Sequence, residues 1–189
     1  MIIVEVGIKL KNDLEYYDKI LRENGLVNDF YVQTHDIYYT NKSLDGLTEK
    51  EMKDACIRLR SCNNGDYDIQ NKLSKCIIRN KVKINKLNKF EKKLEKLGYK
   101  KVFDTLKDDY HYYRNGMTSK IQLQQVKDIG LLVYFDNKEY YDLDQEEQRK
   151  KLIDELNSYG FTIKYSELDL DKLRTLYYKK EMFSKNQNS

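Results

Sequence analysis

The sequence predicts an α+β fold, in which strands and helices together form one domain. Three segments repeat apolar residues at helical spacing, and each ends at a glycine. Between them lie runs in which apolar and polar side chains alternate with the period of two typical of a strand. Along the chain the order is strand, helix, several strands, helix, several strands, helix, so the two halves are loosely alike.

The helices have recognisable beginnings and ends. Leu14, Tyr17 and Leu21 form the apolar stripe of the first, and the third begins at Asp144 with Glu147 three residues later, as in a capping box. We expect three helices near residues 12–25, 87–98 and 144–160, a shorter one at 48–53 and a last one at 169–182.

The predicted strands are informative because many of them have one apolar and one basic face. Arg58 and Arg60 share one face of their strand, while Ile57 and Leu59 share the other. Two architectures fit this pattern: an antiparallel sheet with one wet face, or a closed barrel with helices outside and a basic interior. In the second, converging Lys and Arg side chains would bind a polyphosphate. The expected strands are 2–11, 30–40, 55–62, 73–84, 101–115, 118–127 and 130–137.

Composition restricts the class of protein. The chain has 189 residues, 35% of them charged, and a formal net charge of +4, which is too small an excess to argue for a nucleic-acid partner. Cys56, Cys62 and Cys76 lack paired metal-ligand spacing, so we expect reduced thiols. No signal peptide is visible, and no apolar run reaches the length of about 18 residues that a membrane span needs. We therefore expect a cytoplasmic protein without a membrane partner.

Familiar catalytic motifs are missing from the sequence. His35 and His111 are better explained as surface or hydrogen-bonded residues than as ligands or bases. There is no Gly-rich phosphate loop, and no Ser/His/Asp or Cys/His set indicates covalent catalysis.

The order of several short motifs resembles a known family. The opening "VEVGIKL" is similar to the ExExK strand of the CYTH domain, found in the triphosphate tunnel metalloenzymes, which include class IV adenylate cyclases and thiamine triphosphatases. Further along the chain the resemblance continues in the family's order through "HDIYY", "CIRLR", "LEKLGYKKVFDTLKDDYHYY", "DIGLLVYFD" and "KLRTLY".

The resemblance implies a closed antiparallel β-barrel of about eight strands with helices packed outside, over residues 1–183, followed by a short polar tail at 184–189. Carboxylates would hold Mg²⁺ or Mn²⁺, with Glu5 and Asp136 as the metal ligands. The matching cations would bind the substrate phosphates: Lys9, Arg58, Arg60, Arg79 (or Lys75 or Lys81 in another register), Lys107 and Arg174.

The chain also departs from the family pattern. Gly7 replaces the second Glu of ExExK, and Asp109 replaces an Arg two residues beyond Lys107. Gln124 and Tyr134 stand where acidic residues are expected. The cations are therefore mostly kept while the metal ligands are mostly lost.

Because the cations are kept and most metal ligands are lost, two functions are compatible with the sequence. One is a metal-dependent enzyme that cyclises ATP or hydrolyses a nucleoside or organic triphosphate. The other is a CYTH protein that captures or senses a nucleotide or polyphosphate without turnover. In either case we expect a monomer or homodimer.

Overall fold

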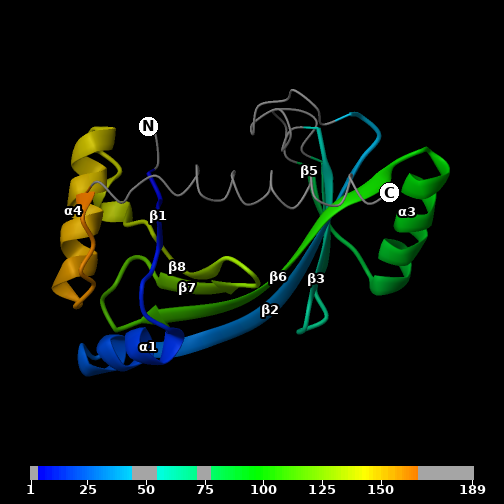
Figure 1. Cartoon of the computed structure of the whole chain (residues 1–189). Helices are drawn as coiled ribbons and strands as arrows, with labels where there is room; N and C mark the ends of the chain where they lie inside the picture. Colours follow the sequence, from blue (N-terminus) through cyan, green and yellow to red (C-terminus); the bar gives the residue numbers. More distant parts are fainter. Residues whose placement is uncertain (1–3, 44–54, 72–77, 166–189) are drawn as a thin grey trace. The chain divides into compact units, whose positions relative to one another are not determined.

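The computed structural model (Figure 1) describes residues 4–43, 55–71 and 78–165. Hydrogen bonds join eight strands of this part of the chain into an antiparallel sheet in the order β1-β8-β7-β6-β2-β3-β4-β5. The chain divides into two compact units: unit 1 is Met1–Tyr31 with Lys107–Arg174, and unit 2 is Val32–Leu106 with Thr175–Ser189. The α+β class with antiparallel strands is thus confirmed.

Unit 1 contains the two ends of the described chain. Its elements are β1 (Val6–Lys9), α1 (Leu14–Glu23), the start of β2 (Val27–Thr40), the end of β6 (Lys100–Tyr113), β7 (Ile121–Val126), β8 (Gly130–Phe135), the short 3-10 helix η1 (Lys138–Tyr140) and α4 (Gln145–Ser158). β1 pairs with β8, β8 with β7, and β7 with β6, all antiparallel.

One face of this part of the sheet packs against helices. Ile8 and Phe135 are buried in one apolar cluster with Leu21 of α1 and Leu156 of α4. Burying each such side chain stabilises the fold by about 1.5–3 kcal/mol. The buried Gln148 of α4 adds a polar connection, because its Oε1 accepts a hydrogen bond from the Val4 backbone N–H at 3.1 Å. The helices are thereby fixed to one face, and the opposite face holds the polar residues.

Unit 2 repeats this division of the two faces. It contains β3 (Ile57–Cys62), β4 (Tyr67–Asn71), β5 (Ile78–Lys81), α3 (Ile84–Lys96) and the rest of β2 and β6. Leu87 and Leu94 of α3 pack against Tyr39, Ile57 and Leu59 of the strands. Because side chains alternate along a strand, Asp36, Arg58, Arg60 and Asp68 lie on the other face.

Most predicted elements are found. The first and third long helices are confirmed, with Asp13 and Asp144 as N-caps, while α3 begins at Ile84 rather than at Leu87. The helices expected at 48–53 and 169–182 and the tail at 184–189 lie outside the described residues.

Strands β4 and β5 differ from expectation. The sequence did not predict β4, whose residues are mainly polar, and the end of the strand expected at 73–84 is wrong because helix α3 starts there. In the described pairing β1 and β5 are the end strands, so closure into a barrel stays a prediction. None of the helices within the described ranges has both the length and the apolar character needed to cross a bilayer.

Candidate functional site

The polar face of unit 2 brings two of the predicted phosphate ligands together. On the β2–β3–β4 ladder, Arg60 pairs with Asp36 on one side and Asp68 on the other, and Arg58 lies two residues before Arg60 on β3. All four residues share the face opposite α3 because residues two apart along a strand point the same way. The sheet register therefore produces an alternating cluster of acidic and basic side chains.

Arg60 forms a bidentate ion pair with Asp36. Its Nε donates to one carboxylate oxygen at 2.5 Å and an NH2 nitrogen donates to the other at 2.7 Å. Burial lowers the pKa of Arg60, but the hydrogen bonds and the charge of Asp36 outweigh burial, so the pKa is raised above its usual value. Arg60 is thus a permanent cation fixed in one orientation.

The guanidinium of Arg58 has fewer of its hydrogen-bond donors satisfied than that of Arg60. Arg58 is only 8% exposed, and the carboxylate oxygens that pair with it among the described residues, on Asp36 and Asp68, are 3.8 and 3.6 Å away. These contacts are ion pairs beyond normal hydrogen-bond length, and its Nε is buried without a hydrogen-bond partner. A buried guanidinium with an unused donor is costly unless another acceptor satisfies it. Arg58 is therefore the group in this cluster best prepared to receive an anion.

Of the other predicted phosphate-binding arginines, Arg79 is placed by its backbone pairing alone. Arg79 lies on β5, with its Cα paired with Gln70, which is itself paired with Arg58. The backbone register thus places Arg79 in the row of Arg58. Arg174 lies outside the described residues.

Unit 1 has its own polar row, built by β6 and β7. Lys107, Asp109 and His111 share one face of β6, and the register pairs Asp109 with Gln124 and His111 with Gln122. Asp109 Oδ1 accepts hydrogen bonds from the side-chain amides of Gln122, at 2.7 Å, and Gln124, at 2.5 Å. Both Lys107 and Asp109 are 6% exposed. The alternation expected from sequence for these two strands is confirmed.

The side chain of Lys9 passes over Gly130, which lies in the same row of the sheet as Lys107. The Cε of Lys9 lies 3.4 Å from the position that a Cβ on Gly130 would occupy. Gly130 pairs with Val126 on β7, and Val126 pairs with Lys107 on β6. A Cβ at residue 130 would be in van der Waals contact with Lys9, so Gly130 leaves the end of the lysine side chain more room along the sheet.

The predicted metal ligands lie on neighbouring strand ends. Val6 pairs with Phe135, so Glu5 and Asp136 are the next residues beyond this pair at the β1 and β8 ends. The hydroxyl of Tyr141 donates a hydrogen bond to Asp136, and this bond, with burial and the charges of Asp136 and Glu5, raises the pKa of Tyr141 to about 12. Two carboxylates thus act on one tyrosine hydroxyl.

This pair suits one divalent ion better than two. In the described part of the chain, no group of three or more His, Cys, Asp or Glu side chains is arranged to hold a metal. Mg²⁺ keeps several waters and needs one or two protein carboxylates when substrate phosphates supply other oxygens. Glu5 and Asp136 fit that requirement for a single ion.

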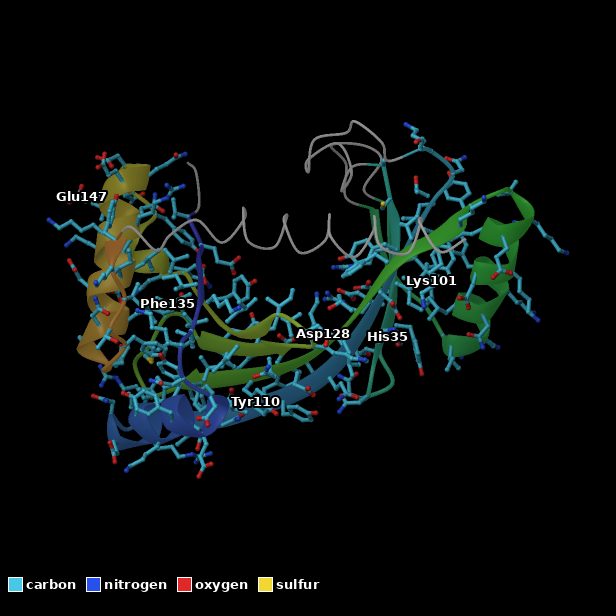
Figure 2. The ribbon with its side chains drawn as sticks, in the orientation of Figure 1. His35, Lys101, Tyr110, Asp128, Phe135 and Glu147 are labelled. Atoms are coloured by element: carbon cyan, nitrogen blue, oxygen red, sulfur yellow. The ribbon has the colours of Figure 1, made fainter. Side chains whose placement is uncertain are left out.

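The two histidines have structural partners. His35 Nε2 lies 3.2 Å from an oxygen of Asp104, which also contacts Lys101; Figure 2 labels His35 and Lys101. The ring of His111 lies 5.1 Å from the ring of Phe30. Burial lowers the pKa of His111, against the charge of Asp109 and with that of Lys120, so the neutral ring is favoured. His35 agrees with the interpretation of a hydrogen-bonded residue, whereas His111 is a half-buried residue packed against an aromatic ring rather than the surface or hydrogen-bonded residue expected.

The fold, though not the sequence, is similar to that of known proteins. No family model matches this chain, and no curated protein matches it. The PH1012 protein of Pyrococcus horikoshii OT3 has a TM-score of 0.57 at 17% identity, and the match covers 88% of this chain and 94% of that one.

Two bacterial structures with the same fold are each described as a "putative adenylate cyclase". The match to the protein from Vibrio parahaemolyticus has a TM-score of 0.56 at 16% identity and covers 87% of this chain and 95% of that chain. For the protein from Bacillus halodurans the TM-score is 0.55 at 8% identity, with coverage of 90% and 96%. At such identities the likeness establishes the fold alone.

Several residues of these polar faces were not predicted as site residues. Asp68 lies on the strand that the sequence did not indicate, and Tyr141 follows the last predicted strand by several positions. Asp36 stood in a matched motif without an assigned role, whereas Asp109 was noted as a departure from the family pattern and as an alternative partner of Glu5 for a single metal ion. Period-two alternation identified their faces, but the identity of their partners depends on strand register.

Proposed function

We propose that this chain is a CYTH-type protein that binds a nucleoside or organic triphosphate through the cations on the polar face of its sheet. Arg58, Arg60, Arg79, Lys9, Lys107 and Arg174 would contact phosphate oxygens. The proposal includes closure of the sheet into a tunnel, as the family resemblance implies. The fold shared with the two bacterial proteins described above supports the nucleotide as the ligand class.

The observation that carries this proposal is the state of Arg58. Among the described residues, this guanidinium is 8% exposed, its Nε has no hydrogen-bond partner and its ion-paired carboxylates are 3.6 Å or more away, so it has hydrogen-bonding capacity that this part of the chain does not use. A phosphate oxygen is the strongest acceptor that a ligand could bring to it. Arg60, held by Asp36, would supply a second fixed positive charge beside it.

We propose further that the bound triphosphate is converted in a reaction that depends on Mg²⁺ or Mn²⁺. Glu5 and Asp136 would hold one ion, and that ion would supply Lewis-acid activation of a phosphoryl group when bound. The lysines and arginines would stabilise the charge that develops on the phosphate oxygens. The reaction would be cyclisation of ATP to cyclic AMP with release of pyrophosphate, or hydrolysis of a triphosphate.

A second candidate function is capture or sensing of the same ligand without turnover. It is favoured by three residues that stand at acidic positions of the resembled family and cannot act as carboxylate ligands, namely Gly7, Gln124 and Tyr134. Both candidates share the binding step and differ only in the chemistry that follows.

One set of measurements separates them. ATP and inorganic tripolyphosphate are titrated into the protein by calorimetry with Mg²⁺ or Mn²⁺, and product is followed in the same samples. Metal-dependent turnover that Glu5→Gln abolishes supports the enzyme. Tight binding without product supports capture. If neither compound binds, the proposal is wrong.

A further inference from the structure

Asp109 places a negative charge beside Lys107 in the polar row that β6 and β7 form in unit 1. It lies two residues from Lys107 on the same face of β6, so the two side chains leave the strand about 7 Å apart. A carboxylate at this distance weakens the attraction of Lys107 for a phosphate group. A surface that bound only phosphate would not be expected to contain it.

The structure holds this carboxylate firmly in position. Gln122 and Gln124 donate their amide hydrogens to the same oxygen, Oδ1, at 2.7 and 2.5 Å. A buried carboxylate fixed by two donors cannot turn away when a ligand arrives. These two bonds do not use Oδ2, and the residue keeps 6% of its surface exposed.

The neighbours of Asp109 add acceptors rather than cations. Gln122 directs its amide nitrogen to Asp109, so its carbonyl oxygen remains an acceptor. His111, the next residue on this face, favours the neutral form, whose ring has one acceptor nitrogen. This part of the row is therefore complementary to hydrogen-bond donors.

We propose that Asp109 is a specificity-determining residue that binds a hydroxyl or amino group on the organic part of the ligand. This inference rests on the proposed function and narrows it. The ligand is an organic triphosphate that carries hydrogen-bond donors, as a nucleotide does, and inorganic polyphosphate is disfavoured. Lys107 and Lys9 bind phosphate oxygens, and Asp109 selects against a ligand that consists of phosphate alone.

The test compares two ligands and two charge-matched variants. ATP and inorganic tripolyphosphate are titrated into the full chain by calorimetry, for the wild type, Asp109→Asn and Asp108→Asn. Asp108 is the adjacent carboxylate on the opposite face of β6, where it accepts a hydrogen bond from the Tyr31 hydroxyl at 2.7 Å. Both substitutions remove one negative charge, so Asp108→Asn controls for net charge.

We expect the wild type to bind ATP more tightly than tripolyphosphate. Asp109→Asn should lower the ratio of the ATP affinity to the tripolyphosphate affinity about tenfold or more, the usual effect of losing a hydrogen bond to a charged group. Tripolyphosphate binding should not fall, and should rise by about fivefold as the repulsion is removed. Asp108→Asn should leave the ratio of the two affinities unchanged.

A second variant keeps the negative charge of Asp109 but removes one of the two hydrogen bonds that hold its carboxylate in place. Gln122→Ala removes one of the two amide donors, and circular dichroism and thermal unfolding check that each variant is folded. We expect ATP affinity to fall about threefold because Asp109 is then held less firmly, with tripolyphosphate unaffected.

The outcomes that would overturn the inference are distinct. Equal losses for both ligands would make Asp109 a structural residue only, and an unchanged affinity ratio would show that it does not contact the ligand. Tighter binding of tripolyphosphate than of ATP by the wild type would reverse the proposed selectivity. If the wild type binds neither compound, the proposed function itself fails and the inference fails with it.

Discussion

The carboxylate of Asp36 accepts both hydrogen bonds from the guanidinium of Arg60, at 2.5 and 2.7 Å, and Asp36 has no exposed surface. Arg58 lies 3.8 Å from the same carboxylate. One buried anion therefore acts on two cations of the candidate site. This arrangement keeps the arginines oriented before a ligand arrives, at the expense of part of their attraction for it.

Asp36→Ala should strongly destabilise the protein. Among the described residues it leaves the buried Arg58 and the half-buried Arg60 with Asp68 as the neighbouring carboxylate, and breaking a buried ion pair from one side typically costs about 3–5 kcal/mol. The free energy of unfolding, measured with urea, checks this. Asp142→Ala at an exposed position is the control and should change the value by less than about 0.5 kcal/mol. A loss below about 1 kcal/mol for Asp36→Ala would contradict the expectation.

Arg58→Gln should reduce binding of tripolyphosphate by about tenfold or more, because it removes a charge-assisted hydrogen bond to the ligand. Calorimetry at fixed ionic strength gives the affinity. Arg149→Gln, on the exposed surface of α4, removes the same charge and should have little effect. Similar losses in both variants would mean that tripolyphosphate responds only to overall charge.

Gly130→Ala should lower both stability and phosphate affinity. Gly130 has a φ of +113°, where a Cβ is strained, and that Cβ would meet Lys9 Cε at 3.4 Å. We expect a loss of about 1–3 kcal/mol in the free energy of unfolding. Tripolyphosphate affinity should also fall because the added methyl group contacts Lys9 and restricts the positions that its side chain can take.

Gly116→Ala separates strain from the lysine contact. Gly116 also has a positive φ, of +88°, but a Cβ there meets nothing within 4 Å. This variant should lose stability and keep its affinity for tripolyphosphate. An equal loss of affinity in the two variants would remove the role assigned to Gly130.

The stability of the protein should fall with pH below about 6.5 through His111. Burial lowers the pKa of this residue in the folded state from its ordinary value of 6.5. The unfolded chain therefore takes up the proton first as pH falls, and proton binding to the unfolded state favours unfolding. Urea unfolding between pH 5 and 8 should show a smaller decline for His111→Asn than for the wild type. The difference in the free energy of unfolding between the two proteins at pH 8, where the ring is neutral, gives the effect of the substitution itself. If that difference stays the same down to pH 5, His111 is not the cause of the decline.

The sequence predicted the elements better than it predicted the contacts between them. Glycine ends and apolar spacing located α1 and α4, and alternation identified the polar faces of β3, β6 and β7, because both signals are local. β4 was missed because it is only five residues long, so its alternation rests on Tyr67 and Ile69 alone, and the burial of its Asp68 depends on pairing with neighbouring strands.

The candidate site could be predicted only in outline. The resemblance named Arg58 and Arg60, but not that Asp36 and Asp68 face them, because those pairings follow from the register of three strands. It marked Asp109 as a departure without showing the two glutamines that hold it. Partners that are distant in sequence leave no periodic signal along the chain.

The division of the chain into two units also bears on how it is synthesised. Residues 32–106 of unit 2 form a continuous stretch, whereas unit 1 combines the first 31 residues with the segment that begins at Lys107. The strands of unit 2 can therefore begin to pair while the ribosome is still translating the rest. β1 is made well before β8, its hydrogen-bonding neighbour, and cannot pair until β8 is translated. Until then the apolar residues of β1 lack this partner strand, which makes the nascent β1 segment a target for chaperones.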